Sequence, residues 1–373
     1  MVLFYLLFLP LFSAIYFSGH WIFYKIWQSQ LHLIGSNRYF FIIALALMGS
    51  GLFITSVTAR IDQLQALSQL SGVVSYFWLT VLLYTLLISG VFKIILFFIP
   101  DIPFGAYATS IATVLGIIIS ISGVFRANAI TVPHHAIYSS KIKKPVRIMH
   151  ISDVHFSPVI GSEMARKIQE IYKKYQPDII ISSGDLLDSG ISDRKIVTEI
   201  LDSIRPPMGK YACTGNHEFI SGIDYSTKFH EETGFNLLRN SSVTIDNFVI
   251  AGVDDPSALR MGDIKSIPSD SELFSGKPDD KFRILIKHQP FIMNEKKPAF
   301  NLQLSGHTHN GQLFPFSLFT SLIFKYDYGF YELTNEASVV VSSGTGTWGP
   351  YSRVGTAPEI IIIDLLPSPP NAN

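Results

Sequence analysis

The chain has 373 residues, long enough for more than one domain, and 48% of them are hydrophobic, a high share for a soluble enzyme. Its 29 basic and 29 acidic residues cancel, which excludes the strongly basic surface that nucleic-acid-binding proteins present. Cys213 is the only cysteine, so the chain can form neither an internal disulfide nor a zinc cluster of cysteines.

The first 125 residues are predicted to form a membrane segment, because they hold only six charged side chains. Apolar runs of about 20 residues, the length that crosses a bilayer as a helix, recur along this segment. So few charges argue against helices buried in a soluble domain, and the first run lacks the basic start of a cleaved signal peptide. We therefore predict four transmembrane helices, in residues 1–18, 39–58, 74–99 and 104–125.

Four crossings would leave the N-terminus and the following domain on the same side of the membrane. Basic residues are enriched in cytoplasmic loops, and the side that carries the large domain is slightly richer in them. That side holds Arg60, Arg126, Lys141, Lys143, Lys144 and Arg147, whereas the other holds Lys25, Arg38 and Lys93. The predicted location is the inner (plasma) membrane, with the large domain toward the cytoplasm.

Residues 126–145 are predicted to be a polar connector, and from residue 146 short apolar strands alternate with amphipathic helices. Strands at 146–151, 178–183 and 210–214 flank helices at 163–175 and 194–204, an order that indicates a layered α/β domain. This domain is expected to extend from residue 146 to residue 366, followed by a disordered Pro-rich tail at 367–373. Its later strands are predicted at 243–251, 282–287, 302–305, 338–342 and 359–364.

Polar residues with metal-binding atoms follow five of these strands. In open α/β sheets, functional groups gather beyond the carboxyl ends of the strands, so these segments are expected to face one another. The segments are Asp153-Val154-His155, Gly184-Asp185, Gly215-Asn216-His217-Glu218, His288 and Gly306-His307-Thr308-His309.

The residue types in these segments suit a pair of divalent metal ions. Mixed imidazole and carboxylate ligands favour Mn, Fe, Zn or Co, and the two oxygens of Asp185 can bridge two ions. Two ions about 3.5–4 Å apart would clamp phosphoryl oxygens and activate a bridging hydroxide for attack on phosphorus. His217 lies beside Asn216 and is not needed as a ligand, so we expect it to protonate the leaving oxygen or stabilise the transition state.

This series of motifs resembles the calcineurin-like metallophosphoesterase family over residues 150–365. The resemblance implies an αββα two-sheet sandwich with a dinuclear metal site, in which Asp188 and Glu218 orient the ligands and His217 is catalytic. It implies that Asp153, His155, Asp185 and His309 hold one metal, and that Asp185, Asn216, His288 and His307 hold the other.

The N-terminal helices and the glycine-rich stretch 343–350 resemble the bacterial membrane-associated branch of that family. That stretch either lines the substrate cleft or forms a tight turn between strands, and it leads to Arg353, a candidate phosphate contact. His150, within the first strand, is predicted to be a packed core histidine.

The expected function is hydrolysis of a phosphate ester, with a phosphodiester favoured. Because the anchor holds the site near the bilayer, membrane lipids are expected partners, and a phospholipid or lipid-linked pyrophosphate is a candidate substrate. Two alternatives stay open: a phosphatase acting on phosphoserine or phosphothreonine in proteins, and a membrane sensor or transporter that the metal domain regulates. Transport argues for ionisable groups within the membrane, and the predicted helices have almost none.

Overall fold

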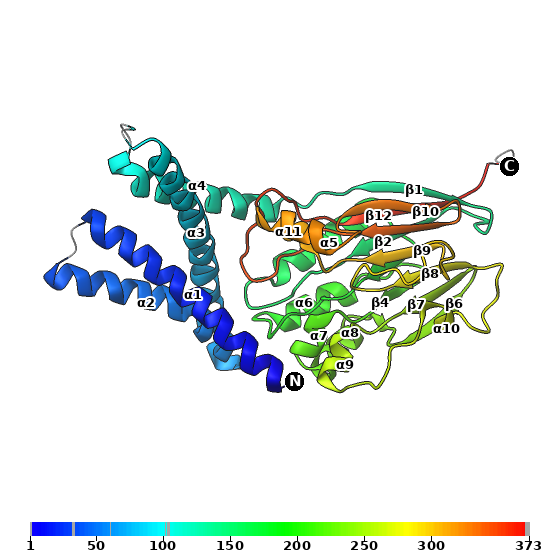
Figure 1. Cartoon of the computed structure of the whole chain (residues 1–373). Helices are drawn as coiled ribbons and strands as arrows, with labels where there is room; N and C mark the ends of the chain where they lie inside the picture. Colours follow the sequence, from blue (N-terminus) through cyan, green and yellow to red (C-terminus); the bar gives the residue numbers. More distant parts are fainter. Residues whose placement is uncertain (1, 32–33, 60, 101, 103–104, 370–373) are drawn as a thin grey trace. The chain divides into compact units, whose positions relative to one another are not determined.

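The computed structural model describes residues 2–31, 34–59, 61–100, 102 and 105–369. Residues 1 and 104, at the ends of two predicted apolar runs, and residues 370–373 of the predicted tail lie outside the described residues. The chain divides into two compact units (Figure 1). One is built on the residues up to Arg126 together with Gly349–Val354, and the other on Ala127–Trp348 and the residues from Gly355 onward.

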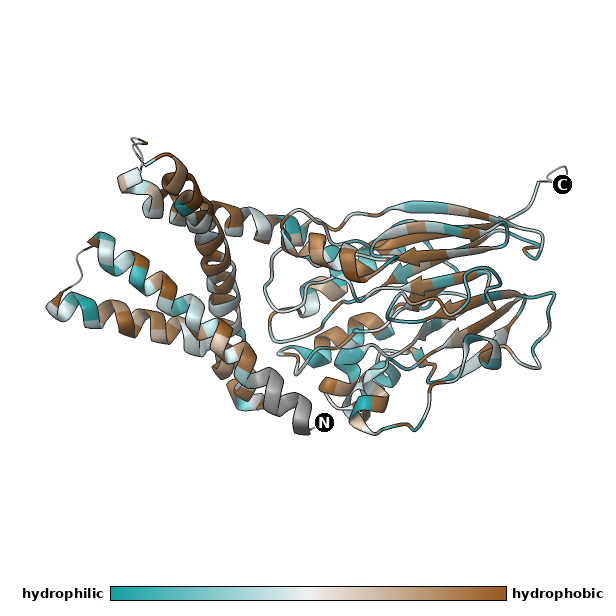
Figure 2. Cartoon of the chain, in the orientation of Figure 1, coloured by the Kyte–Doolittle hydropathy of each residue, from teal (hydrophilic) through white to brown (hydrophobic). Residues whose placement is uncertain are grey.

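The first unit consists of long helices joined by short turns. They are α1 (Val2–Leu31), α2 (Gly35–Thr58), α3 (Gln65–Phe98) and α4 (Ala108–Asn128), with single 3₁₀ turns η1 (Asp62–Leu64) and η2 (Gly105–Tyr107). Figure 2 shows hydrophobic residues along α2, α3 and α4. Among the described residues, three helical stretches are long and apolar enough to cross a membrane: Gly35–Thr58, Gln65–Phe98 and Gly105–Asn128. They suggest membrane anchoring, and the fourth crossing, expected in α1, stays a prediction.

Small and polar residues join α2 to α3, as is usual where helices pack in lipid. A Cβ atom on Gly51 would lie 2.8 Å from the Cβ of Ser75, so only glycine allows this approach of the two helices. Nearby, the hydroxyls of Thr55 and Ser71 are 2.8 Å apart and hydrogen-bonded. Such contacts can associate helices where a lipid surrounding provides no hydrophobic driving force.

The second unit contains two mixed six-stranded sheets. The first has the order β1-β12-β2-β3-β4-β5, and the second has the order β10-β11-β9-β8-β7-β6. The strands of the first sheet are β1 (His134–Ser139), β2 (Val146–Ile151), β3 (Ile179–Ser182), β4 (Lys210–Ala212), β5 (Asn236–Leu237) and β12 (Ile361–Pro367). Those of the second are β6 (Ser241–Ile245), β7 (Phe248–Gly252), β8 (Phe282–Ile286), β9 (Leu302–Ser305), β10 (Gly329–Thr334) and β11 (Ala337–Val341).

The two sheets pack face to face and share one apolar core, which confirms the predicted two-sheet sandwich. Ile148 and Ile181 of the first sheet lie in the same buried cluster as Ile250 and Ile284 of the second. Strands buried on both faces need near-continuous apolar runs, and Ile179–Ser182 has one. The apolar composition of this strand therefore matches its burial on both faces.

Helices cover the outer face of the first sheet, because β2, β3, β4 and β5 are parallel and are connected by helical crossovers. A second apolar cluster, which includes Leu273 and Phe274, covers the outer face of the second sheet. The helices of this unit are α5 (Ser162–Tyr175), α6 (Arg194–Asp202), α7 (Asn216–Ile220), α8 (Ile223–Glu232), α9 (Ser257–Met261), α10 (Asp270–Leu273), η3 (His309–Gly311) and α11 (Phe316–Ile323).

Three predicted boundaries differ from the structure. The expected connector 126–145 contains strand β1, which pairs in parallel with β12 and buries Ile137; the partner strand is more than 200 residues away, so no local pattern revealed it. The expected tail begins inside the sheet, since β12 runs to Pro367. The single strand expected at 243–251 is a hairpin, because Asp246 adopts a left-handed conformation (φ 44°) and turns the chain.

Candidate metal centre

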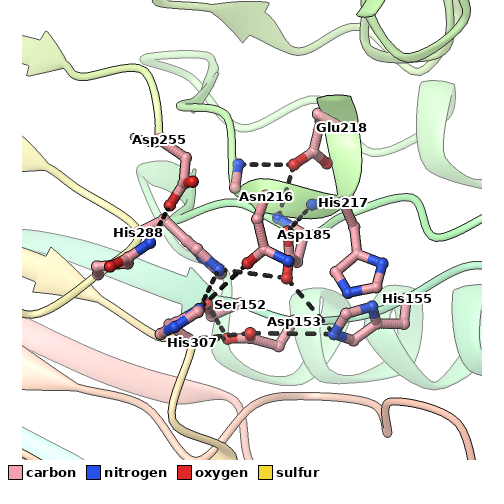
Figure 3. A network of polar contacts seen from close by, with 12 residues as sticks. Ser152, Asp153, His155, Asp185, Asn216, His217, Glu218, Asp255, His288 and His307 are labelled. Carbon is pink, nitrogen blue, oxygen red and sulfur yellow. Dashed lines mark hydrogen bonds and ion pairs between the residues drawn. The ribbon is translucent and has the colours of Figure 1, made fainter. Parts of the chain in front are cut away.

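The predicted site residues lie together at the carboxyl ends of the parallel strands of both sheets (Figure 3). Asp153 and His155 follow β2, Asp185 follows β3, and Asn216 begins α7 just after β4. From the second sheet, His288 follows β8, whereas His307 and His309 follow β9. Both sheets contribute because their carboxyl edges meet at the same end of the sandwich.

One group of donor atoms forms around His155 and His309. Their Nε2 atoms lie 3.0 Å apart, and the Nε2 of His309 is 3.3 Å from Oδ1 of Asp153. The Nε2 of His155 is also 3.8 Å from Oδ2 of Asp185. Four side chains therefore aim their donor atoms at one point.

A second group forms around His288. Its Nε2 lies 3.2 Å from Oδ2 of Asp185 and 3.1 Å from Nδ1 of His307. That Nδ1 is in turn 3.2 Å from Oδ1 of Asn216. The same Asp185 oxygen thus belongs to both groups.

The donor set fits divalent cations. Facing imidazole nitrogens about 3 Å apart can share at most one proton, whereas a cation between them satisfies both lone pairs. Burial alone would raise the pKa of Asp185, but the facing imidazoles of His288 and His217 lower it well below its ordinary value, so the carboxylate is ionised. Clusters of buried His and Asp donors that could hold an ion recur three times among the described residues: Asp153/His155/His309, His155/Asp185/His217 and Asp153/Asp185/His288.

Most of these residues have a left-handed backbone conformation (positive φ), which residues other than glycine rarely adopt. The φ angles of Asp153, His155, Asp185, His307 and His309 lie between 50° and 73°. Such left-handed residues each cost on the order of 1–3 kcal/mol and persist where the surroundings enforce them, typically at functional sites. This conformation lets side chains two positions apart, Asp153 with His155 and His307 with His309, point toward the centre, and the sequence pattern did not predict it.

Two glycines make room for the carboxylates. A Cβ atom on Gly215 would lie 2.1 Å from Oδ1 of Asp185, and one on Gly306 would lie 2.1 Å from Oδ2 of Asp153. These distances are far inside van der Waals contact, so any side chain at either position would displace a ligand.

Glu218 braces the loop that carries Asp185. Its buried carboxylate accepts hydrogen bonds from the backbone N–H groups of Asp185 (2.9 Å), Leu186 (2.9 Å) and Gly215 (2.6 Å). The orienting role that the resemblance implied for Glu218 is thus met by contacts to backbone rather than to a ligand side chain.

Replacing Glu218 with glutamine is expected to lower the free energy of unfolding by about 1–3 kcal/mol, because an NH₂ group would face buried N–H donors. Thermal unfolding midpoints of the purified variants would measure the loss. The matched control is Glu231→Gln, at an exposed position of α8 in the same domain. Equal midpoints for the two variants would contradict the bracing role.

A chain of hydrogen bonds between buried polar residues leads to the carboxylate of Asp153. Ser152 Oγ donates to the Asp153 carboxylate, and Ser183 Oγ donates to Ser152 Oγ at 2.8 Å. His150 Nε2 lies 2.8 Å from Ser183 Oγ, and burial lowers the pKa of His150 to about 3, so this imidazole is neutral. His150 is therefore a buried, hydrogen-bonded core histidine, as predicted.

His217 lies at the edge of the two donor groups. Its Nδ1 is in contact with Oδ1 of Asp188, which leaves the other ring nitrogen for a different partner. Burial by itself would lower the pKa of His217, but the charges of Asp185 and Asp188 outweigh this and raise it to about 9. His217 thus belongs to one candidate donor cluster, with His155 and Asp185, and also pairs with Asp188.

The glycine-rich loop 343–350 borders the centre. The N–H groups of Thr345 and Gly346 donate to the carbonyls of Ser152 (2.7 Å) and Asp153 (3.0 Å). The half-exposed indole of Trp348 has its centroid 6.0 Å from that of His217. Trp348 is held there by Gln312, whose amide exchanges two hydrogen bonds with its backbone.

Two further residues are placed by the structure. Arg353 is buried in the helical unit, where its backbone N–H donates to the carbonyl of Gly123 at 3.0 Å, and a phosphate contact by its guanidinium stays a prediction. Asp255 was missed: it is buried and accepts a hydrogen bond from Gln289 beside His288 at 2.7 Å. A signal existed, since Asp255 follows the apolar strand β7 just as the other site residues follow theirs.

Comparisons with known proteins agree with this geometry. A family model described as calcineurin-like phosphoesterase matches residues 146–311. An uncharacterized metallophosphoesterase of Aquifex aeolicus (strain VF5) is 36% identical over 239 residues, which cover 63% of this chain and 91% of that protein. A Danio rerio protein named transmembrane protein with metallophosphoesterase domain is 31% identical over 232 residues, 59% of this chain and 53% of that protein.

Among solved structures, a phosphoesterase from E. coli has 15% identity and a TM-score of 0.29, with 56% of this chain and 82% of that chain covered. The high coverage of the Aquifex relative, together with the buried His/Asp donors, identifies the class of enzyme. The chain belongs to the calcineurin-like phosphoesterase family and is a metallophosphoesterase, a hydrolase acting on phosphoric esters, with a buried His/Asp metal site.

Proposed function

We propose that this chain is a membrane-anchored dinuclear phosphoesterase that hydrolyses a phosphodiester or a lipid-linked phosphate. The main support is that one carboxylate oxygen belongs to both donor groups. Oδ2 of Asp185 lies 3.8 Å from Nε2 of His155 and 3.2 Å from Nε2 of His288. In this proposal one metal is held by Asp153, His155, Asp185 and His309, and the other by Asp185, Asn216, His288 and His307. The donor set favours Mn, Fe, Zn or Co.

When bound, the two cations supply Lewis-acid polarisation of the phosphoryl oxygens and a nucleophilic water of lowered pKa. The chain's own residues do the rest. His217 holds a proton toward the leaving oxygen, and Asp188 keeps its imidazole protonated and oriented. The Glu218 carboxylate and the strained backbone keep the donor atoms in position before substrate arrives.

The membrane part of the proposal adds a fourth crossing in α1 to the three long apolar helices. The name of the Danio relative, a transmembrane protein, supports anchoring. The slight excess of lysine and arginine on the side of the catalytic domain supports an inner (plasma) membrane location with that domain in the cytoplasm. A lipid-linked substrate would then need no diffusion through the solvent.

Purified full-length chain in detergent micelles with Mn²⁺ should hydrolyse bis-p-nitrophenyl phosphate, followed by release of nitrophenolate. The same preparation is expected to act more slowly on a phosphoserine peptide, assayed by released phosphate. Faster turnover of the peptide would replace the proposal with a protein phosphatase. No turnover of either compound by metal-loaded protein would favour a membrane sensor or transporter regulated by the metal domain.

A further inference from the structure

Helix α11 (Phe316–Ile323) of the catalytic domain is apolar and exposed, a combination that soluble surfaces rarely show. None of its residues is buried, and Leu322 and Ile323 are 84% and 68% exposed. Figure 2 shows the hydrophobic character of the helix, which Figure 1 labels. Exposure of these apolar side chains to water is unfavourable, so we expect an apolar partner to cover the helix.

The exposed surface continues onto the segment after His288. The rings of Phe291 and Phe324 lie 5.5 Å apart, and Lys325 Nζ is 2.5 Å from Oε2 of Glu295, so the two segments are neighbours. Both contribute exposed apolar side chains to what we name the apolar face, made of Phe291, Met293, Phe316, Leu318, Phe319, Leu322 and Ile323.

The apolar face borders the metal centre. The ring of Phe324, which directly follows α11, has its centroid 5.6 Å from that of His307. Phe291 lies three residues after His288, on the segment that leaves the same strand end. Whatever covers the apolar face is therefore brought next to the metal site.

The exposed charges near the face are basic on balance. Lys296 and Lys297 follow Met293 and are exposed. Lys325 is ion-paired with Glu295, and the half-buried Asp327 accepts a hydrogen bond from Thr320 of α11. A second copy of this chain would offer the same two exposed lysines, which like-charge repulsion opposes. Anionic lipid head groups match Lys296 and Lys297, and the acyl region matches the apolar side chains.

A short linker connects helix α4, which the proposed function places in the membrane, to the first strand of the catalytic domain. Residues 129–133 alone separate the end of α4 at Asn128 from the start of β1 at His134, a span of roughly 20 Å at full extension. From Lys296 and Lys297, the apolar face and the short linker we infer that the apolar face docks into the surface of an anionic phospholipid bilayer beside the metal centre. This inference rests on the membrane anchoring of the proposed function, but it does not require the substrate to be a lipid.

An environment-sensitive probe on Leu322 tests the docking directly. The single native cysteine, Cys213, is buried, so a Leu322→Cys variant of the full chain can be labelled at one place with a nitrobenzoxadiazole dye, with wild-type protein reporting any labelling of Cys213. The labelled chain is reconstituted into vesicles of phosphatidylcholine and phosphatidylglycerol. We expect a blue shift of emission and loss of intensity with doxyl-labelled lipid, since docked apolar side chains lie roughly 5–10 Å deep.

The matched control is Ile196→Cys, an exposed apolar position on α6 of the same domain. Its probe should keep water-like emission and resist quenching by doxyl lipid. Replacing phosphatidylglycerol with phosphatidylcholine should weaken the Leu322 signal, because Lys296 and Lys297 then lose the anionic head groups that they contact. Equal quenching at the two positions would overturn the proposal. So would a Leu322 signal that is insensitive to doxyl lipid but disappears on dilution with unlabelled chain, since a second copy would then cover the face.

Discussion

Asp185→Asn is expected to lower the rate of phosphodiester hydrolysis by at least about a thousandfold. One carboxylate oxygen faces His155 and His288 together, so the change removes charge from both donor groups at once. Loss of several kcal/mol of charge stabilisation in the transition state corresponds to that factor. Steady-state turnover of bis-p-nitrophenyl phosphate measures it.

Metal content provides a second readout that does not depend on turnover. Two equivalents per chain should be found in wild-type protein after loading and gel filtration, and fewer in Asp185→Asn. Because bound metal stabilises the folded state by mass action, the variant should also gain less in unfolding temperature when Mn²⁺ is added. Asp263→Asn, at an exposed position, is the matched control and should behave as wild type. Full metal content and full activity in Asp185→Asn would refute the bridging role.

His217→Ala should lower the turnover of an alkyl phosphate ester by about 10²–10⁴-fold while leaving metal content intact, the range expected for loss of general acid catalysis. This pattern separates His217 from the ligands, although one buried donor cluster includes it. The matched control is His134→Ala, on the exposed edge strand β1. A loss of bound metal in His217→Ala would show that this histidine is a ligand.

The leaving group distinguishes proton donation from charge stabilisation by His217. Nitrophenolate is a stable anion that leaves without a proton, whereas an alkoxide needs one. The loss of rate in His217→Ala should therefore be larger for an alkyl ester than for a nitrophenyl ester of the same phosphate. Equal losses for both esters would indicate that His217 stabilises charge on the phosphoryl group instead.

The apolar face would give the enzyme a physical route to its substrate. Exposed apolar side chains lie beside the ligands, and a bilayer docked there would deliver phosphate groups at the height of the metal site. A lipid-linked phosphate would then meet the metal centre and the proton donor in one approach.

Local sequence determined most of the catalytic domain. Alternation of apolar strands and amphipathic helices predicted β2, β3, β4, α5 and α6, because burial on one or both faces requires those periods. The position of polar residues directly after apolar strands predicted the site residues, since strand ends of neighbouring strands meet at one sheet edge. The same rule applied to β7 would have found Asp255.

Only the tertiary structure decided what depends on partners distant in the chain. Strand β1 exists because β12, more than 200 residues later, pairs with it. The left-handed backbone at Asp153, Asp185 and His307 follows from packing around the centre, since these residue types do not by themselves prefer that conformation. Exposure of α11 could not be read from its composition, because a run of apolar residues looks the same in sequence whether a core covers it or not.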